Sequence, residues 1–376
     1  MLSFWEQQSF LNYNAIVIGG GIVGLSAACS LCEHKPGMNV LVIERGMFPT
    51  GASTKNAGFA CFGSAAEIWS DIQILGEEKA LELVNWRMRG LGKLRNRLGD
   101  VNIGYLEYGG GEFVLKNEPF DETIIDKLNP LLKDMFAKEP FSINNKKINE
   151  FGFAKDGVKI FIENHGEGQI DTGLMMKNLM KYAALLGITI LSGCEVKSFE
   201  DNKQTVEVEV FHSLLNETVK FKADKLAICT NAFTKQFFPE LDVVPGRGQI
   251  LATKPIPGLP FKGIFHFDEG YFYFRNHGER IIFGGGRNMD FEGETTPAFE
   301  LNKTIQDQLD YYLQTLIIPG RSYEVETRWA GIMAFGKEKL PIIKQVSENV
   351  VLGCRMNGMG IAIGSLVGER LAGMMR

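Results

Sequence analysis

Three glycines at fixed spacing and one acidic residue give this sequence its clearest chemical signal. Gly19, Gly21 and Gly24 form a Gly-x-Gly-x-x-Gly pattern, and Glu44 lies 20 positions after the last of them. In this pattern the first glycine permits a tight turn, the second lets a pyrophosphate approach the main chain, and the third lets a helix pack on a strand. An acid at the end of the next strand accepts hydrogen bonds from ribose hydroxyls. The spacing therefore predicts a dinucleotide-binding site.

The sequence contains every element that such a site requires. Residues 14–18 form a nearly continuous apolar run, and residues 22–34 carry apolar side chains at helical spacing. Pro36 and Gly37 then break the helix before a second apolar run at residues 39–43. The same glycines could form a turn in an unrelated sheet. The complete strand–turn–helix–strand unit favours the nucleotide site, because the helix start offers free N–H groups to phosphates.

Two further segments could contact a nucleotide or a substrate. Residues 51–59 are small, polar and glycine-rich, as expected of a loop that wraps phosphates. Tyr271, Tyr273 and Arg275 alternate with two phenylalanines, which places all three on one face of a predicted strand. That face is either a polar, aromatic pocket or an exposed strand edge with Arg275 in water.

The cysteines favour packing over redox or metal chemistry. Cys29 and Cys32 form a Cys-x-x-Cys pair, but neither a second pair nor a histidine cluster accompanies them. Because they lie one turn apart inside the predicted first helix, we interpret them as buried small side chains and expect no metal site. All six cysteines lie in apolar stretches. This usage is typical of a reducing compartment, so we expect a cytoplasmic protein.

Composition excludes several classes of protein. Of the 376 residues, 45% are hydrophobic and 23% are charged, as in folded globular proteins. Lys plus Arg is 40 and Asp plus Glu is 45, which gives a net charge of −5, and no basic run predicts a nucleic-acid surface. The uncharged run at residues 15–32 contains four glycines. A buried strand, turn and helix are therefore favoured over a membrane span.

The order of predicted elements indicates an α/β (α+β) fold with two domains. Helices are expected at residues 64–99, 172–186 and 301–316, and strands at 217–223 and 226–229. Strand-like segments dominate residues 243–333. We expect a Rossmann-like, discontinuous nucleotide-binding domain formed by residues 12–100, 150–240 and 336–376. A mainly antiparallel β substrate domain would comprise residues 101–149 and 241–335.

Several short motifs follow one another along nearly the whole chain. Besides the glycine pattern with Glu44 and the loop at 51–59, they are residues 168–171, 194–196, 229–232, 245–249, 328–331, 340–343 and 357–360. In this order the sequence resembles FAD-dependent oxidoreductases of the D-amino-acid oxidase superfamily. The resemblance is to the branch that holds glycine and sarcosine oxidases, D-amino-acid dehydrogenases and gamma-glutamylputrescine oxidases.

The resemblance implies FAD in an extended form and assigns residues to each part of it. Residues expected at the pyrophosphate and the adenosine are Gly19, Gly21, Ile22, Val23, Glu44 and Arg45. Residues expected at the diphosphate and flavin are Ser53, Thr54, Asn56, Ala57 and Gly58. Val196 would flank the adenine, and Thr230 and Asn231 would close the nucleotide site. Residues expected to line the flavin are Gly331, Asn357, Gly358, Met359 and Gly360.

Two departures from the family pattern affect the predicted chemistry. Many relatives that oxidise amino acids carry a carboxylate-binding arginine where this chain has Met333, which weakens a prediction of glycine or a simple D-amino acid as substrate. Sarcosine-oxidase-like members tether the flavin to a cysteine in the same stretch, and residues 333–336 contain none. We therefore expect noncovalent FAD.

The resemblance implies oxidation of a C–N bond of a small amine or amino acid by hydride transfer to flavin N5. Oxygen or a quinone would take the electrons. The candidate catalytic residues are Tyr273, Arg275 and Arg328, although Arg328 could instead pair with Glu324 or Glu326. Two alternatives stay open: oxidation of a 2-hydroxy acid by the same fold, and a binding protein with this fold and no catalytic activity.

Overall fold

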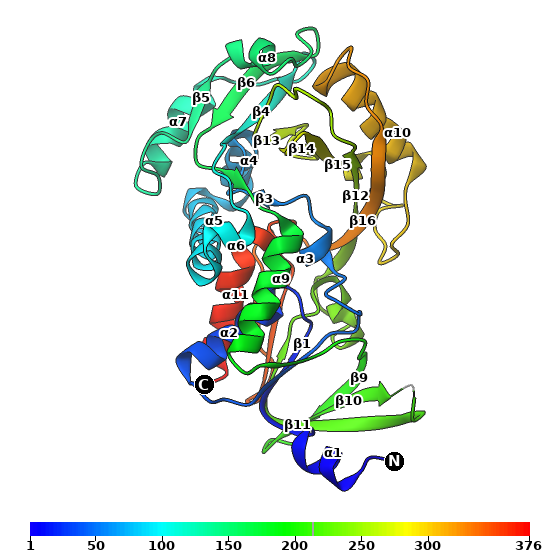
Figure 1. Ribbon diagram of the computed structural model, residues 1–376. Coiled ribbons are helices and arrows are strands. Elements are labelled where there is room, and N and C mark those ends of the chain that lie inside the picture. Colours follow the sequence, from blue (N-terminus) through cyan, green and yellow to red (C-terminus); the bar gives the residue numbers. More distant parts are fainter. Residues whose placement is uncertain (213) are drawn as a thin grey trace.

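Two large sheets dominate the structure, a computed structural model that describes residues 1–212 and 214–376. They lie at opposite ends of the molecule in Figure 1, and helices and loops fill the region between them. Among the described residues, no helix is long and apolar enough to cross a membrane.

The first sheet is a mostly parallel sheet with the order β17-β18-β11-β1-β2-β8, and β10 and β9 extend from β11. The four innermost contacts, β18-β11, β11-β1, β1-β2 and β2-β8, are parallel. Strand β2, the last four residues of β1 and the last three of β11 are apolar and buried, as expected where both faces of a sheet are covered. The strands are β1 (Asn12–Ile18), β2 (Val40–Ile43), β8 (Thr189–Leu191), β9 (Val196–Asp201), β10 (Val206–His212), β11 (Glu217–Ile228), β17 (Ile342–Gln345) and β18 (Val350–Cys354).

Strand β1 has β2 on one side and β11 on the other, so chain connections diverge at its carboxyl end. The N–H of Gly19 donates to the carbonyl of Ile43 at 2.8 Å, and the N–H of Cys229 donates to that of Ile18 at 2.8 Å. In open α/β sheets ligands bind in the crevice at such a divergence. The fold therefore places the glycine pattern where a nucleotide site is expected.

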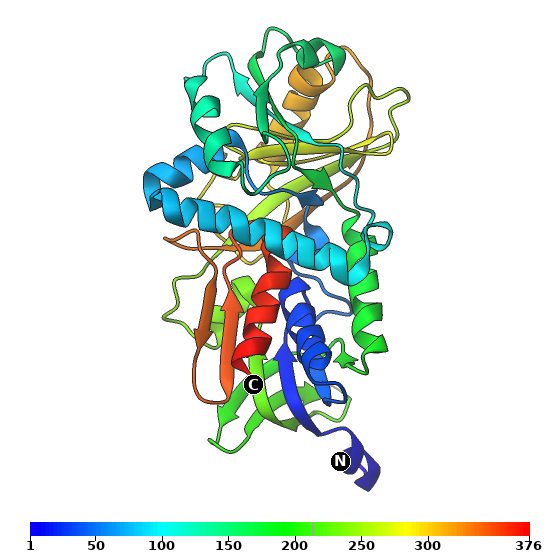
Figure 2. The same cartoon turned by 90° about the vertical axis from the view of Figure 1, so that its left-hand side faces the viewer.

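Glycines allow close packing of the helices beneath this crevice. On α11 (Gly360–Met374), a Cβ at Gly368 would lie 2.6 Å from the N atom of Ala27 in α2 (Ile22–His34). A Cβ at Gly90, in α5 (Glu77–Leu98), would lie 2.2 Å from the carbonyl O of Ala362. Figure 2 shows α5 running across the end of α11. Helix α9 (Thr172–Leu185) is capped by the preceding residue, Asp171, whose side chain accepts from the N–H of Leu174.

The second sheet is mainly antiparallel, with the order β16-β12-β15-β14-β13-β4-β6-β5 and one parallel contact between β13 and β4. One face carries a phenylalanine-rich core that α10 (Lys303–Tyr312) covers through Ile305 and Leu309. The strands are β4 (Gly110–Leu115), β5 (Phe141–Ile143), β6 (Val158–Asn164), β12 (Val244–Thr253), β13 (Ile264–Phe267), β14 (Phe272–His277), β15 (Arg280–Gly285) and β16 (Val325–Phe335).

Short elements connect and flank the two sheets. The remaining strands, β3 (Phe59–Ala60) and β7 (Gly168–Gln169), pair with each other. The remaining helical segments are α1 (Phe4–Ser9), α3 (Ala52–Lys55), α4 (Ala65–Leu75), α6 (Asp100–Ile103), α7 (Thr123–Leu132), α8 (Lys146–Glu150), η1 (Asn231–Gln236), η2 (Arg287–Met289) and η3 (Leu313–Ile317).

Three sequence-based boundaries differ from the structure. The helix predicted at 64–99 is two helices, α4 and α5, because Gly76 between them has φ +84°. The strands predicted at 217–223 and 226–229 form one long strand, β11. Strand β6 pairs with β4 in the second sheet. We therefore propose that the substrate domain includes β6, and that the second segment of the nucleotide domain begins after it.

Cys29 and Cys32 are buried in α2, and burial raises the pKa of the Cys29 thiol to about 12. Replacing both with alanine should leave the visible spectrum expected for bound FAD, and the expected turnover, unchanged, because neither thiol forms a reactive thiolate. The small loss of packing should lower the free energy of unfolding by about 1 kcal/mol for each site. Loss of turnover in a double variant that still folds would instead favour a redox function for Cys29 and Cys32.

Candidate functional site

A cavity of about 630 Å³ lies between the two sheets and takes its walls from both. From the nucleotide-binding half come the turn after β1, the loop at residues 49–57, the start of η1 and the start of α11. From the other half come residues of β13, β14 and β16. Every expected cofactor residue except Thr54 and Gly58 lines this cavity.

The turn after β1 has the shape that a phosphate cradle requires. Gly19 has φ +108°, and a Cβ there would lie 2.5 Å from the carbonyl O of Cys229. Gly21 has an extended φ of −77°, but a Cβ there would lie 2.8 Å from Ser53 Oγ, which accepts from the N–H of Ile22 at 3.0 Å. Helix α2 starts at Ile22 without a side-chain cap. Its N-terminal N–H groups and partial positive charge favour an anion here.

Glu44 and Arg45 follow β2 at the same end of the cavity. The Glu44 carboxylate is buried and accepts from the N–H groups of Gly20 and Gly46, each at 2.9 Å. The Arg45 guanidinium lies 3.7 Å from the centre of the Phe233 ring. Val196, Thr230 and Asn231 complete this end, where the side-chain amide O of Asn231 accepts from the N–H of Arg355 at 3.0 Å. The geometry suits an adenosine that is held by one acid and by main-chain groups.

Asn56 holds the loop at 51–58 in place. Its side-chain amide donates to the carbonyl of Ala52 at 2.9 Å and accepts from the N–H of Gly58 at 2.8 Å. Thr54 Oγ1 donates to the carbonyl of Pro49 at 2.5 Å and lies 3.3 Å from that of Gly51, so its side chain is held against the main chain of the loop and does not line the cavity. Gly58 has φ +77°, and a Cβ there would lie 2.6 Å from an Arg275 nitrogen. Thr54 and Gly58 therefore shape the loop from behind.

The other end of the cavity is formed by β16 and by the start of α11. Gly331, Asn357, Gly358, Met359 and Gly360 line it. Asn357 has φ +48° and donates to the carbonyl of Lys339 at 2.8 Å. The first residues of helix α11, 360–362, line the cavity, and Met359 provides no side-chain cap for their N–H groups. A group that gains negative charge on reduction would be stabilised there.

Tyr273 and Arg275 lie on the same face of β14, as the alternation predicts, but only Tyr273 lines the cavity. Burial raises the pKa of Tyr273 to about 12, so its hydroxyl stays protonated. Arg275 is covered by the loop, and its guanidinium donates to the carbonyls of Ala57 and of Ile170, the latter at 3.0 Å. Arg275 is therefore a support for the loop, and its prediction as a catalytic residue is corrected.

Arg328 also lies outside the cavity. Its guanidinium forms a two-pronged ion pair with Asp310, at 2.7 and 2.9 Å, and donates to Gln306 at 2.6 Å. Both partners belong to α10, on the outer face of the second sheet. Neither Glu324 nor Glu326 is the partner of Arg328, because Glu326 pairs with Arg280 and Glu324 with Lys254. The residue links β16 to α10, which corrects its prediction as a catalytic residue.

Sequence reasoning missed Arg287, which lines the cavity from η2. Its guanidinium lies 4.2 Å from the centre of the Phe335 ring and 5.1 Å from that of Phe291. The Nε atom is buried without a hydrogen-bond partner among the described residues, and burial lowers the pKa of Arg287. The only sequence signal was the run of three glycines, 284–286, that precedes it.

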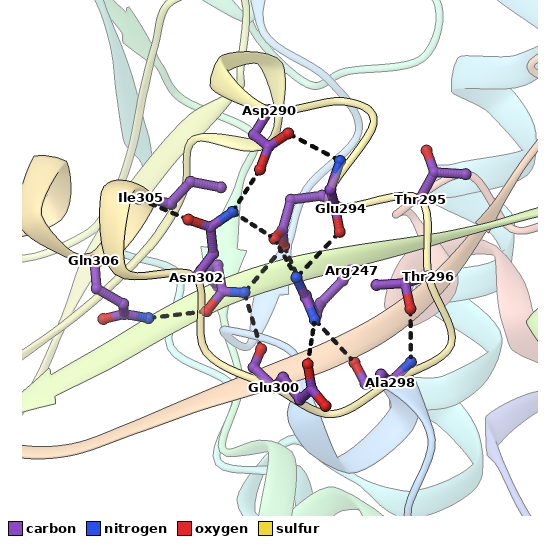
Figure 3. A network of polar contacts seen from close by, with 12 residues as sticks. Arg247, Asp290, Glu294, Thr295, Thr296, Ala298, Glu300, Asn302, Ile305 and Gln306 are labelled. Atoms are coloured by element: carbon purple, nitrogen blue, oxygen red, sulfur yellow. Dashed lines mark hydrogen bonds and ion pairs between the residues drawn. The ribbon is translucent and has the colours of Figure 1, made fainter.

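A buried polar network fastens the loop that carries Arg287 (Figure 3). The Glu294 carboxylate is fully buried and accepts from Arg247 on β12 at 2.6 and 3.0 Å. It also accepts from Gln249 and Asn302, each at 3.0 Å. Asp290 accepts from the N–H of Gly293 at 2.8 Å. Residues 286–302 are thus attached to the sheet at several points, and Arg287 has a defined position.

Comparison with known proteins identifies the family. A family model described as FAD dependent oxidoreductase matches residues 14–374, so the chain belongs to this family. The probable oxidoreductase OrdL of Rhizobium meliloti (strain 1021) is 24% identical over 375 residues, which is 95% of this chain and 81% of that protein. The glycine oxidase of Bacillus subtilis (strain 168) is 22% identical over 354 residues, 90% of this chain and 85% of that protein.

Solved structures confirm the fold prediction. Glycine oxidase from Geobacillus kaustophilus superposes with a TM-score of 0.76 at 19% identity and covers 97% of this chain and 95% of its own. L-proline dehydrogenase from P. horikoshii superposes with a TM-score of 0.75 at 18% identity, with coverages of 96% and 92%. The predicted α/β fold with a second sheet is therefore confirmed.

The protein is an FAD-dependent oxidoreductase. Its own residues fit the cofactor, since the turn at one end of the cavity has no room for side chains at Gly19 and Gly21, where a Cβ would meet Cys229 and Ser53. The starts of α2 and α11, whose N-cap residues provide no side-chain cap, suit the two electron-rich parts of FAD, the pyrophosphate and the flavin. The family assignment sets aside the alternative of a binding protein without catalytic activity.

Noncovalent FAD should be released by acid. The cavity contains one cysteine near the start of α11, Cys61, and burial raises the pKa of its thiol well above the usual value. We expect precipitation of the yellow protein with trichloroacetic acid to leave a colourless pellet and free FAD in the supernatant. A yellow pellet would show a covalent bond.

Replacing Gly21 with valine should abolish FAD binding. The added side chain would displace Ser53 Oγ and fill the space expected for the pyrophosphate. The ratio of flavin to protein absorbance measures the loss, and circular dichroism checks that the chain still folds. The matched control is Gly92→Val, because no atom lies within 4 Å of a Cβ at that position. Stoichiometric FAD in the folded Gly21→Val variant would mean that the phosphates bind elsewhere.

Proposed function

We propose that the protein oxidises the C–N bond of a small amino acid, or of another amine that carries a carboxylate. The observation that supports this most directly is Arg287, a half-buried cation on the cavity wall whose Nε has no hydrogen-bond partner among the described residues. Charge-assisted hydrogen bonds to a carboxylate suit the flat guanidinium, and a site with few waters strengthens them.

The position of Arg287 accounts for Met333, which stands where many relatives carry their carboxylate-binding arginine. Both residues line the cavity, and Met333 lies on β16 two residues before Phe335, the ring that the Arg287 guanidinium faces. Arg287 on η2 would therefore provide, on the same cavity wall, the positive charge that many relatives carry at the position of Met333 on β16. The family relatives named glycine oxidase and D-amino acid dehydrogenase are consistent with an amino-acid substrate.

When bound, FAD supplies the hydride acceptor, flavin N5, and the chain's own residues bind and orient the substrate. Arg287 would hold the carboxylate, and Tyr273 would donate a hydrogen bond from a hydroxyl that stays protonated. Phe59, Met333 and Phe335 supply apolar surface that excludes water from the reacting carbon. The start of α11 would stabilise negative charge that develops at its end of the cavity.

A substrate panel tests the reaction directly. Glycine, D-alanine, L-proline and iminodiacetate represent the amino compounds, and lactate and glycolate represent 2-hydroxy acids. We expect an amino compound, mixed without oxygen, to bleach the flavin absorbance. Bleaching by the hydroxy acids alone would favour the alternative reaction. Return of the colour with oxygen or with a quinone identifies the electron acceptor, for which we propose one of these two.

Arg287→Met should lower kcat/KM for carboxylated substrates about 10- to 100-fold, because a charge-assisted hydrogen bond contributes roughly 1.5–3 kcal/mol. The content of FAD should not change. Each amino acid is compared with its ethyl ester, which keeps the amine and loses the carboxylate charge, and the ester should be affected less. Arg287→Lys should retain part of the activity.

The matched control is Arg280→Met, because Arg280 belongs to the same strand-and-loop segment but pairs with Glu326 at the surface. This variant should keep wild-type kinetics. Equal losses for the amino acid and its ester in Arg287→Met would show that Arg287 does not bind the carboxylate.

A further inference from the structure

A buried carboxylate lies behind the cavity wall with one oxygen unused. Glu167, just before β7, has no exposed surface. Its Oε1 accepts from the N–H groups of Phe62 and Gly63, at 3.0 and 3.1 Å. Its Oε2 is buried without a hydrogen-bond partner among the described residues. Leaving a buried acceptor unpartnered is costly, so this oxygen calls for an explanation.

The group that faces this oxygen is His266 on β13. Its Nε2 lies 3.8 Å from Glu167 Oε2 and is itself buried without a hydrogen-bond partner among the described residues. The imidazole lines the cavity and packs edge-on against Phe59, with ring centres 5.1 Å apart. On this wall of the cavity, Nδ1 is the ring nitrogen that does not face Glu167.

The other carboxylates around His266 already have partners. Glu112, opposite His266 on β4, accepts from Ser64 Oγ and the N–H of Ala66, and burial raises its pKa to about 7. Glu67 forms an ion pair with Arg87 at 3.0 Å. The remaining titratable side chains near this wall are Tyr273 on β14, Cys61 after β3, and Lys339, which pairs with Asp71. In the part of the chain that the structure describes, Glu167 is therefore the one carboxylate of this group with a buried, unpartnered oxygen beside the imidazole.

We propose that His266 is the general base of the reaction and that Glu167 is its positioning residue. In this arrangement Glu167 Oε2 accepts a hydrogen bond from His266 Nε2–H, which leaves the lone pair of Nδ1 directed to the substrate amine. A buried carboxylate that orients an imidazole and stabilises its protonated form is a recurring device in catalysis. The inference rests on the proposed function, because it requires an amine as substrate.

The proton step is balanced without any other reactant. At neutral pH an aliphatic amine is mostly an ammonium ion, and the C–N bond can be oxidised only when nitrogen has a free electron pair. The N–H bond of the ammonium breaks, its electron pair stays on nitrogen, and the proton binds to Nδ1. The positive charge moves to the imidazole, where Glu167 offsets it. No electron is transferred in this step, and the proton later leaves through the cavity to water.

The pKa of His266 fits this assignment. Burial alone would lower the pKa, but Glu167 and the more distant Glu112 and Glu67 outweigh it and raise the value above 6.5. The imidazole acts as a base only when neutral, so the rate of flavin reduction should rise with pH through the pKa of His266. Removing the charge of Glu167 should lower this pKa and move the rise to lower pH.

The first test needs no substrate. The imidazole resonances of the FAD-loaded protein are followed against pH by NMR, and His266→Gln identifies the His266 signal. In Glu167→Gln the amide keeps an oxygen for the two N–H groups but loses the charge, so the pKa of His266 should fall by about one unit or more. Glu163→Gln, an acid on β6 bonded to Asn144, is the control and should leave it unchanged. An unchanged pKa in Glu167→Gln would overturn the pairing.

The second test uses anaerobic flavin reduction by whichever of glycine, D-alanine, L-proline and iminodiacetate reacts fastest. His266→Gln should slow reduction about 100-fold at pH 7, as expected for loss of a general base. The difference in rate between His266→Gln and the wild type should become smaller towards pH 9.5, because more of the amine is then already neutral in solution. If His266 had only a structural role, the loss of flavin-reduction rate in His266→Gln would be the same at every pH. That result, or a wild-type rate at pH 7, would contradict the assignment of His266 as the general base.

The two tests separate this proposal from the proposed function. If none of the four amino compounds reduces the flavin, the proposed function and the base assignment both fail, and the titration still decides whether Glu167 and His266 interact. If an amino compound reduces the flavin and His266→Gln behaves as the wild type, the function stands and the base assignment fails alone.

Discussion

The whole site depends on two helix N-termini, those of α2 and α11, that line one cavity and whose N-cap residues, Gly21 and Met359, provide no side-chain cap. Helix starts left without caps are costly unless a ligand or water takes their N–H groups. The two helices can point to the same place because they pack unusually closely, with Gly364 and Gly368 of α11 against residues of α2. A Cβ at either glycine would have to push the helices apart. The small residues of α11 thus set the distance between the two anion sites.

The nucleotide end could be predicted from sequence because its determinants are local. A glycine pattern, a helix and an acid follow one another within residues 14–44, and short-range geometry decides what they do. The substrate end could not, because its determinants lie far apart in the chain. Alternation correctly placed Tyr273 and Arg275 on one face, yet the covering of Arg275 by residues 57 and 170 depends on packing between distant segments. Arg287 was missed because nothing in its neighbourhood indicates which way it points.

Arg247 and Glu294 show how the substrate end gains a fixed shape without regular structure. A buried ion pair contributes little net stability, since desolvation offsets most of its attraction, but breaking it leaves a buried charge. Here the pair is part of a network that also satisfies Gln249 and Asn302 (Figure 3). The network selects one arrangement of residues 286–302 over others. Recognition of the substrate carboxylate would then depend on Arg287 in the loop at residues 286–302, which the sheet holds in place. The residue at position 333 of the sheet would not need a charge.

Several carboxylates lie close together around His266. Their hydrogen-bond and ion-pair partners distinguish the acids that stabilise the structure from the one that we expect to take part in the reaction. Glu67 forms an ion pair with Arg87, and the Glu112 carboxylate accepts hydrogen bonds from a hydroxyl and an N–H group. Burial raises the pKa of Glu112 to about 7, so neither acid requires a further partner. Glu167 has two N–H groups on one oxygen and only the imidazole near the other. If these acids served stability alone, apolar residues of the same size would serve as well or better. A half-satisfied carboxylate behind an imidazole is instead an arrangement that gains stability when a proton arrives, which is what oxidation of an ammonium substrate must provide.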